Sequence, residues 1–269
     1  MRQADAAFLL AVLTAFSACR GSGAPRPLTA ANEDVKSVRI SRGRESFTLV
    51  QDFPGSWRVV PPDDAVDAAD AAALLDGLRR LAQGPRLSNA AAAYGLAPSE
   101  ATSVRAVGAA DKPLFAALFG RRGPGGAVHL AAVEGGDAYL STGPPPELLA
   151  RGAEDWRDRR LLRGRCKDVE LDTGRGWRPA APATAAVLCG LRATAILPPL
   201  PEFLAGLDRP VLRVRAASGA FAVGSLMGRE RWISIEGRAA LFRAPAAPLA
   251  EAVQNPSREK RPSSGIIPK

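Results

Sequence analysis

Few residues in this chain are of the types that carry out chemistry at neutral pH, and their spacing suits few reactions. The sequence contains one histidine, His129, whereas acid–base and metal sites usually combine a histidine with further ligands or bases. Ser257 and Lys260 have Ser-x-x-Lys spacing, but a catalytic lysine of that kind is desolvated beside its serine, and this copy lies in a polar stretch. The sequence therefore predicts no metal, no cofactor and no enzyme. A hydrolase of cell-wall glycan or lipid that uses carboxylates is the catalytic alternative.

Acidic residues gather at Asp63, Asp64, Asp67 and Asp70. A calcium loop needs alternating ligands and a glycine at its bend, which this stretch does not have. Carboxylates in the first turn of a helix are stabilised by the positive end of the helix dipole. The cluster therefore predicts the beginning of a helix.

Cys19 follows a segment with the order of a secretory signal. Arg2 supplies a positive charge, and residues 6–16 form an eleven-residue run that is apolar apart from Thr14. A charged start, a short apolar run and small residues at its end are typical of signal peptides. The run is shorter than the roughly 20 residues that cross a bilayer as a helix. We therefore predict a signal peptide over residues 1–18 and export from a bacterial cytoplasm.

The sequence Phe16-Ser17-Ala18-Cys19 resembles the lipobox of bacterial lipoproteins, which prefers leucine where this chain has Phe16. The resemblance implies that the cysteine thiol receives a diacylglyceryl group and that the chain is cut just before it. The product would be lipid-anchored on the periplasmic side of a membrane. Two alternatives stay open: cleavage after Ser17 or Gly23, which would give a soluble periplasmic protein, and an uncleaved membrane anchor.

Cys166 and Cys189 are the two remaining cysteines. In an oxidising compartment two facing cysteines tend to form a disulfide, and the alternative is a pair of small apolar core residues. The chain has no Cys-x-x-Cys sequence, so a zinc site is not expected.

The chain is basic, with a formal net charge of +9. Its densest basic run contains Arg157, Arg159, Arg160, Arg163 and Arg165. This run could contact anionic head groups or an acidic partner, and the alternative is a linker whose arginines cap backbone carbonyls. Basic residues interleaved with aromatic residues do not occur, so a nucleic-acid partner is not expected.

Apolar periodicity predicts the elements that would position these residues. Apolar residues at helical spacing from Val66 to Leu81 predict a helix, and alternating residues predict strands at 38–40, 47–50, 57–60, 104–107, 114–120, 128–133 and 138–140. This order predicts an α+β fold with two related units, each an antiparallel sheet with a packed helix. We expect a lipidated tether over 19–34, a first unit over 35–152, a second, shorter unit over 153–253 and a disordered tail over 254–269.

The second half of the sequence echoes the first and indicates an internal duplication. Trp177-Arg178 echoes Trp57-Arg58, Leu188 to Arg192 echoes Leu75 to Arg79, and Gly228 stands where Gly120 stands in the first half. Chance similarity between two alanine-rich stretches is the alternative.

Two short segments also carry a family resemblance. Tyr94-Gly95-Leu96-Ala97-Pro98 and Trp156-Arg157-Asp158-Arg159-Arg160-Leu161-Leu162 are similar to segments of the domain-of-unknown-function 4340 family, and matches in order run from about residue 35 to 165. The resemblance implies an envelope protein, commonly tethered to a membrane and sometimes encoded beside ABC transporter components. It implies no reaction. It favours an adaptor or binding module for a membrane assembly.

Replacing Cys19→Ser tests the lipid anchor. We expect the wild-type chain to fractionate with membranes and to carry an acylated N-terminal Cys19, because several acyl chains anchor a protein firmly. The variant should be released from membranes or stall as an uncleaved precursor. Mass spectrometry of the mature N-terminus is the measurement, and an unmodified terminus at Ala18 or Ala24 would contradict the prediction.

Overall fold

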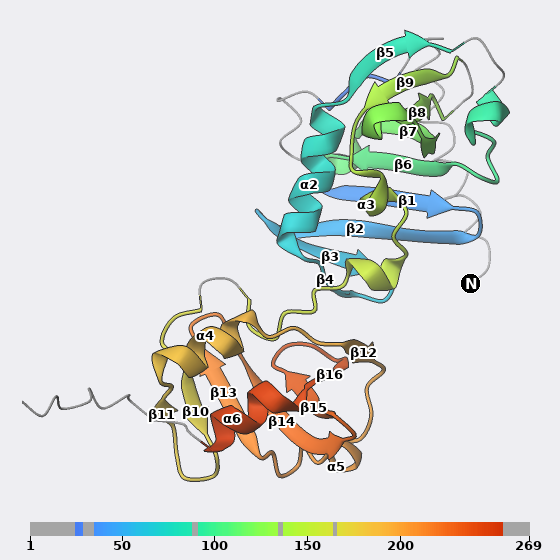
Figure 1. The fold of residues 1–269 in the computed structure, drawn as a ribbon. Helices are drawn as coiled ribbons and strands as arrows, with labels where there is room; N and C mark the ends of the chain where they lie inside the picture. The colour runs from blue at the N-terminus through green and yellow to red at the C-terminus, as the bar shows by residue number, and fades with distance from the viewer. Residues whose placement is uncertain (1–24, 29–34, 88–90, 134–136, 164–165, 255–269) are drawn as a thin grey trace, which may run out of the picture. The chain divides into compact units, whose positions relative to one another are not determined.

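The computed structural model describes residues 25–28, 35–87, 91–133, 137–163 and 166–254, which fall into two compact units divided between Asp158 and Arg159 (Figure 1). The predicted signal peptide, Cys19, Arg165 and the Ser257 to Lys260 stretch lie outside these residues. No helix in the described ranges is long and apolar enough to span a membrane.

The first unit is built on a sheet whose described strands follow the order β4-β3-β2-β1-β6-β7-β8-β9-β5, with antiparallel neighbours throughout. The strands are β1 Ser37–Arg42, β2 Glu45–Phe53, β3 Ser56–Val60, β4 Asp64–Ala65, β5 Ala82–Arg86, β6 Thr102–Val107, β7 Pro113–Arg122, β8 Val128–Ala131 and β9 Tyr139–Thr142. Short helices lie between the strands, η3 Ala91–Tyr94, η4 Ala109–Asp111 and η5 Pro124–Gly126, and two more follow β9, α3 Pro146–Leu149 and η6 Ala153–Trp156.

Helix α2, Ala68–Arg79, packs on one face of this sheet (Figure 1). It begins at Asp67, whose side chain accepts a hydrogen bond from the Ala69 N–H at 3.0 Å and so satisfies one of the free donors of the first turn. Leu74 and Leu78 are fully buried and contribute to a core that includes Trp57. The predicted helix and its apolar face are confirmed.

The second unit has a sheet with the order β11-β10-β13-β14-β15-β16-β12, again antiparallel between the described neighbours. Its helices α4 and α6 cover one face (Figure 1), where Leu188 and Leu249 meet alternate residues of the central strands. The elements are β10 Glu170–Asp172, β11 Arg178–Pro179, α4 Pro182–Gly190, β12 Ala195–Leu197, α5 Glu202–Ala205, β13 Leu212–Ala216, β14 Gly219–Met227, β15 Glu230–Ile235, β16 Leu241–Pro245 and α6 Ala246–Gln254. The predicted α+β class with antiparallel sheets is therefore confirmed.

The edge strands β5 and β12 were not predicted from the sequence. Strand β5 contains Gly84 and Pro85, which are poor strand formers, and it pairs with β9 from a distant part of the chain. Strand β12 has only three residues and pairs with β16. In both cases the segment is a strand because it pairs with a strand from a distant part of the chain, so its own residue pattern gives little indication of a strand.

The division between the units falls after Asp158, six residues later than the expected boundary at 152/153. The reason is Trp156, which is fully buried in the core of the first unit. The expected tether also differs in part, because Leu28 is buried in that core and its N–H donates to the Leu78 carbonyl at 3.1 Å.

The two units share one order of elements. Each has a first strand that pairs with the first strand of a later four-stranded meander, β1 with β6 and β10 with β13. Each then has a helix followed by a strand that pairs with the last strand of the meander, β5 with β9 and β12 with β16. A duplicated unit would have this common order, and the duplication itself stays a prediction.

A close backbone contact recurs at the same place in both units. A Cβ on Gly120 of β7 would lie 2.3 Å from the carbonyl oxygen of Tyr94, and a Cβ on Gly224 of β14 would lie 2.1 Å from that of Ala205. The echo between Gly120 and Gly228 is therefore not the structural one. Gly228 lies in the turn after β14, where a Cβ would meet nothing within 4 Å.

Gly120→Ala and Gly224→Ala should each lower the free energy of unfolding by about 1–3 kcal/mol, because a methyl group cannot fit against a fixed backbone carbonyl. The measurement is urea unfolding of each variant. Gly190→Ala is the matched control, since a Cβ there meets nothing within 4 Å and a helical alanine is favoured over glycine by up to about 1 kcal/mol. Equal effects at Gly120 and Gly190 would contradict the assigned contact.

Candidate functional site

The arginine run begins with a buried ion pair. Arg157 donates from Nε to Asp64 at 2.8 Å and from Nη1 to Glu154 at 2.6 Å. The side chains of Arg157 and Asp64 are only 9% and 8% exposed. Asp64 belongs to β4, and Arg157 forms an isolated bridge with Val66, so the pair joins the chain end of the unit to its sheet edge.

The charge of Arg157 is held firmly. Burial lowers the pKa of its guanidinium, but the hydrogen bonds to Glu154 and Asp64 and their negative charges raise it further, so its pKa lies above its usual value. Arg157 therefore stays protonated at any physiological pH. It acts as a structural cation in the first unit.

The other described arginines of the run are also partly buried and contact neighbouring segments. Arg159 donates to the Thr194 carbonyl at 3.0 Å, and Arg160 forms a backbone bridge with Arg192. Arg159, Arg160 and Arg163 are all half-buried. Arg159 thus has the carbonyl-capping role of the linker alternative, whereas Arg157 is held in an ion pair that neither alternative included. Arg165 lies outside the described ranges.

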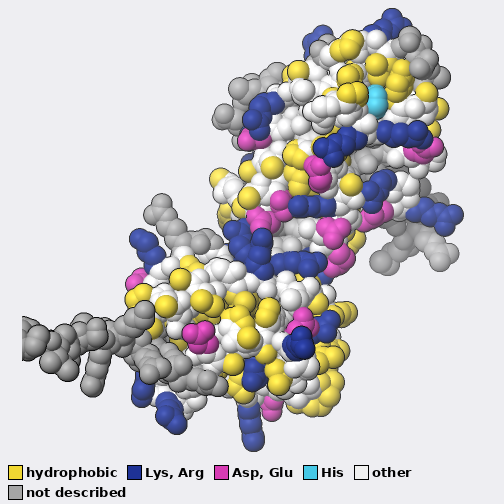
Figure 2. Space-filling view, viewed as in Figure 1, with side chains coloured by type: hydrophobic (Ala, Val, Ile, Leu, Met, Phe, Trp, Pro, Cys, Tyr) yellow, Lys and Arg dark blue, Asp and Glu magenta, His cyan; other side chains and the backbone are white. Residues whose placement is uncertain are grey.

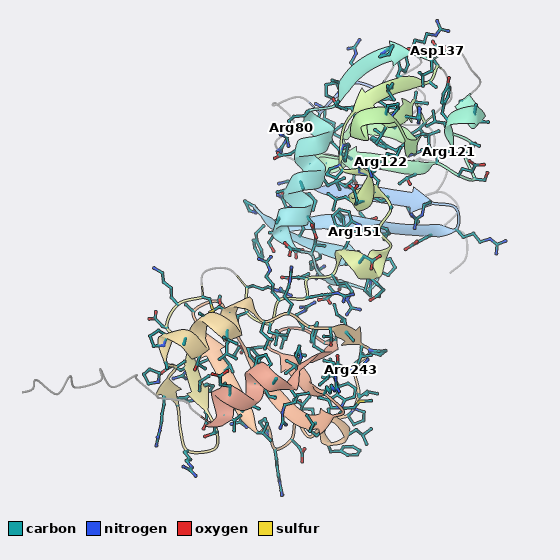
Figure 3. The ribbon with its side chains drawn as sticks, in the orientation of Figure 1. Arg80, Arg121, Arg122, Asp137, Arg151 and Arg243 are labelled. Atoms are coloured by element: carbon teal, nitrogen blue, oxygen red, sulfur yellow. A yellow bond between two sulfur atoms is a disulfide. The ribbon has the colours of Figure 1, made fainter. Side chains whose placement is uncertain are left out.

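The acidic cluster is likewise used by the fold. Asp63 and Asp52 pair with the exposed Arg58 at 3.2 and 3.1 Å. Asp70 pairs with Arg151, which is labelled in Figure 3, and Asp67 caps α2. No group of three or more potential metal-binding side chains occurs among the residues that the structure describes.

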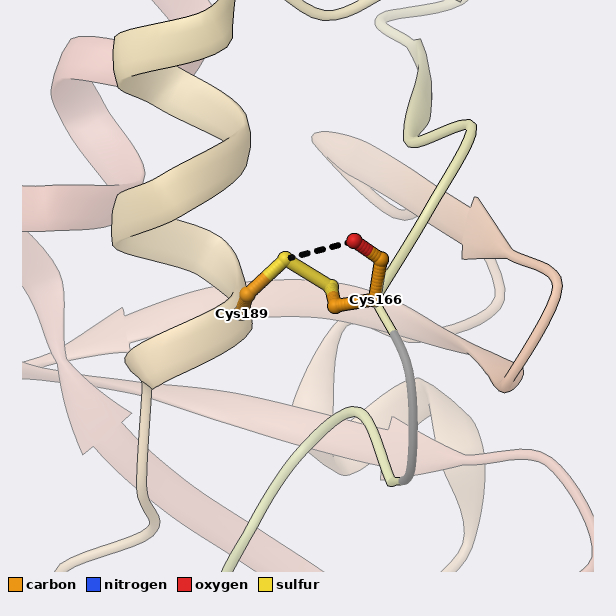
Figure 4. The surroundings of a disulfide bond; sticks show 2 residues. All are labelled: Cys166 and Cys189. Atoms are coloured by element: carbon orange, nitrogen blue, oxygen red, sulfur yellow. Dashed lines mark hydrogen bonds between the residues drawn. A yellow bond between two sulfur atoms is a disulfide. The ribbon is translucent and has the colours of Figure 1, made fainter.

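Cys166 and Cys189 form a disulfide in the structure, with their Cα atoms 5.7 Å apart (Figure 4). It joins the segment before β10 to the last turn of α4, and both residues pack against the core of the second unit. The Cys189 Sγ also lies 3.9 Å from the Cys166 carbonyl oxygen. A disulfide sulfur carries no hydrogen, so this is a van der Waals contact. The disulfide acts as a structural cross-link within the second unit.

His129 lies on the opposite side of β8 from the buried Val128 and Leu130, as its alternation predicts. Its ring stacks on Tyr94 with 4.8 Å between the centroids. Its Nδ1 lies 2.7 Å from the Arg121 carbonyl oxygen, which fixes a proton on that nitrogen because a carbonyl can only accept. These contacts hold η3 against the meander.

The strongest candidate for binding is the sheet face of the second unit that α4 and α6 leave uncovered. It contains a hollow of about 600 Å³. Leu212 and Val214 point to the core, so Arg213 and Arg215 alternate onto the open face. Its lining residues are Trp177, Arg213, Val214, Arg215, Ala216, Ala217, Gly219, Ala220, Phe221, Ala222, Ser234 and Glu236.

The charged residues that line this hollow differ in whether they have an ion-pair partner. Arg215 lies with its guanidinium 4.2 Å from the Trp177 ring and pairs with Glu170. Arg213 and Glu236 make no ion pair or side-chain hydrogen bond with another residue in the described ranges. Small alanine side chains form the floor between them. The hollow therefore offers an aromatic wall, a free cation and a free carboxylate.

Sequence reasoning missed this surface. It placed Trp177 as the echo of Trp57, but Trp57 is buried in β3 whereas Trp177 precedes β11 and is 37% exposed. The alternation of Arg213 and Arg215 between valine and leucine was the available signal, because it indicates two arginines on one sheet face. Trp177 reaches that face from a different segment, which no local pattern shows.

Comparison with known proteins adds no assignment: no family model, no curated protein and no solved structure matches this chain.

The buried pair gives a stability test. Arg157→Met removes the buried guanidinium that pairs with the Asp64 carboxylate, so the free energy of unfolding should fall by about 3–5 kcal/mol. Arg58→Met is the control, because exposed ion pairs contribute about 1 kcal/mol or less. Thermal and urea unfolding are the measurements. Similar losses for the two variants would show that the Arg157 pair is not the anchor inferred from its burial.

Proposed function

We propose that this chain is a non-catalytic lipoprotein of the bacterial cell envelope, anchored through Cys19, that acts as an adaptor or binding module for a membrane assembly. The observation that carries the proposal is the open sheet face of the second unit. Its arginines and Trp177 line a shallow hollow instead of a deep cleft with paired catalytic groups.

The chemistry of the hollow favours an acidic partner. Arg213 has no counter-ion among the described residues, so an incoming carboxylate would gain a charge-assisted hydrogen bond without displacing an existing pair. Trp177 is already held on one side by Arg215, and rigid aromatic side chains next to arginines are typical anchors of protein interfaces. We expect the partner to be an envelope protein with an acidic surface.

The hydrolase alternative needs two facing carboxylates. Glu236 is the one carboxylate among the described residues that line the hollow, and a single acid supplies either the acid or the base of such a mechanism but not both. This composition supports binding over hydrolysis at this surface.

The family resemblance adds a proposal about the assembly. The resemblance to the domain-of-unknown-function 4340 family implies components of an ABC transporter as partners. A tethered module beside a transporter needs a docking face and an anchor, and both features are parts of the present proposal.

Crosslinking in intact cells tests the partner. A photo-reactive residue at Ser234, which lines the hollow, should capture an envelope protein, and Arg213→Glu should reduce the crosslinked yield roughly tenfold by placing like charges together. Arg44→Glu is the matched control, because Arg44 is an exposed arginine of the first unit. An unchanged yield with Arg213→Glu would count against this surface. Loss of cellular function in a folded, exported Glu236→Gln variant that still crosslinks would favour the hydrolase.

A further inference from the structure

The second unit exposes a continuous apolar segment before and within α5. Residues 198–204 read Pro-Pro-Leu-Pro-Glu-Phe-Leu, and every one of them is exposed. Phe203 is 67% and Leu204 is 59% exposed. Short connecting segments are usually polar because they face water, so six apolar residues out of seven need a physical reason.

A second exposed apolar segment lies beside the first. Leu226 and Met227, at the end of β14, are 56% and 50% exposed. The two segments are joined where the Ser225 hydroxyl donates to the Ala205 carbonyl at 3.0 Å. We call Leu200, Phe203, Leu204, Leu226 and Met227 the apolar patch. Figure 2 shows hydrophobic side chains gathered over the α5 end of this unit.

The apolar patch is specific to the second unit. Among the described residues of the first unit, Phe53 is the one large hydrophobic side chain with comparable exposure, and it stands alone. Scattered single hydrophobic residues are ordinary on protein surfaces, whereas a contiguous group indicates an interaction site.

Charges of both signs border the apolar patch. Glu202 and Asp208 are exposed acids, and Arg209 and Arg229 are exposed bases. None of the four side chains forms an ion pair or hydrogen bond with another residue in the described ranges. A balanced, unpaired rim suits phospholipid head groups, whose phosphates accept from arginine and whose ammonium groups donate to carboxylates.

We propose that the apolar patch docks on the surface of a phospholipid bilayer, with Phe203, Leu204, Leu226 and Met227 entering the boundary between head groups and acyl chains. The proposal rests on the proposed function in one respect: the lipid anchor would hold the chain at a membrane and make the bilayer the nearest apolar phase. The patch would add a second attachment to that anchor.

The dependence of binding on salt concentration distinguishes apolar docking from electrostatic docking. Binding that depends on a basic patch weakens steeply with salt, but here two acids offset two bases in the rim. Apolar insertion should therefore dominate, and vesicle binding should change little between low and physiological ionic strength. The prolines at 198, 199 and 201 fix the backbone of the segment, so little conformational freedom is lost on docking.

Vesicle flotation of the mature chain, residues 19–269 with Cys19→Ser, tests the patch without the acyl anchor and without the apolar run of the predicted signal peptide. With vesicles of phosphatidylethanolamine and phosphatidylglycerol, we expect measurable binding that Phe203→Ser with Leu204→Ser lowers at least tenfold. Phe53→Ser is the matched control and should bind as the parent does. Both substitutions change exposed side chains, so thermal unfolding should be unchanged and a folding defect can be recognised.

A gain of signal provides the second measurement. In Phe203→Trp, brominated lipids should quench the added tryptophan fluorescence, whereas Phe53→Trp should show no added quenching. Equal binding of the double variant and its parent would overturn the proposal, as would self-association of the parent that the double variant abolishes, because the patch would then be an interface between two copies. Vesicle binding by a chain whose wild type proves unacylated would leave this inference standing while the proposed anchor fails.

Discussion

Each unit is built on a sheet that has two faces, and the helices among the described residues cover one of them. Helix α2 covers one face in the first unit, and α4 with α6 cover one face in the second. The other face is closed only at one end, where η3 or α5 lies against the meander. There the backbone approaches so closely that Gly120 and Gly224 have no room for a side chain. The unclosed remainder of that face is open to water or to a partner.

How much the sequence predicts follows from whether a residue's surroundings are local. The strands around Ile40 and Leu49 and the helix through Leu78 have their periodicity in the neighbouring residues, and the structure agrees with them. Strand β5 was missed because its order comes from β9. Arg157 looked like a surface cation because its partner Asp64 lies 93 residues earlier in the chain. Trp177 echoes Trp57 in the sequence, but the tertiary fold buries Trp57 and leaves Trp177 37% exposed.

The two candidate binding surfaces were also predictable only as far as their features are local in the sequence. Alternation indicates that Arg213 and Arg215 share a face. The alanines beside them form a hollow only together with Trp177, which comes from another segment, so the hollow could not be predicted from the local sequence. The apolar stretch at residues 198–204 is visible in the sequence, yet apolar residues in a row predict burial as readily as exposure. Its exposure depends on how α5 is placed, with Gly206 in the left-handed region at a φ of 64° turning the chain back toward Leu207 and the core.

The disulfide between Cys166 and Cys189 has a consequence for when the chain folds. The two cysteines are 23 residues apart in the sequence. In the chain-entropy model, a cross-link of that span lowers the conformational entropy of the unfolded chain and so raises the free energy of unfolding by about 3 kcal/mol. Thiols stay reduced in a cytosol, so under the export proposed above a newly made chain would lack that contribution to the stability of its second unit until it reached an oxidising compartment. On that proposed route the second unit would be easier to unfold before export than after oxidation, and the disulfide would make unfolding less favourable once it had formed.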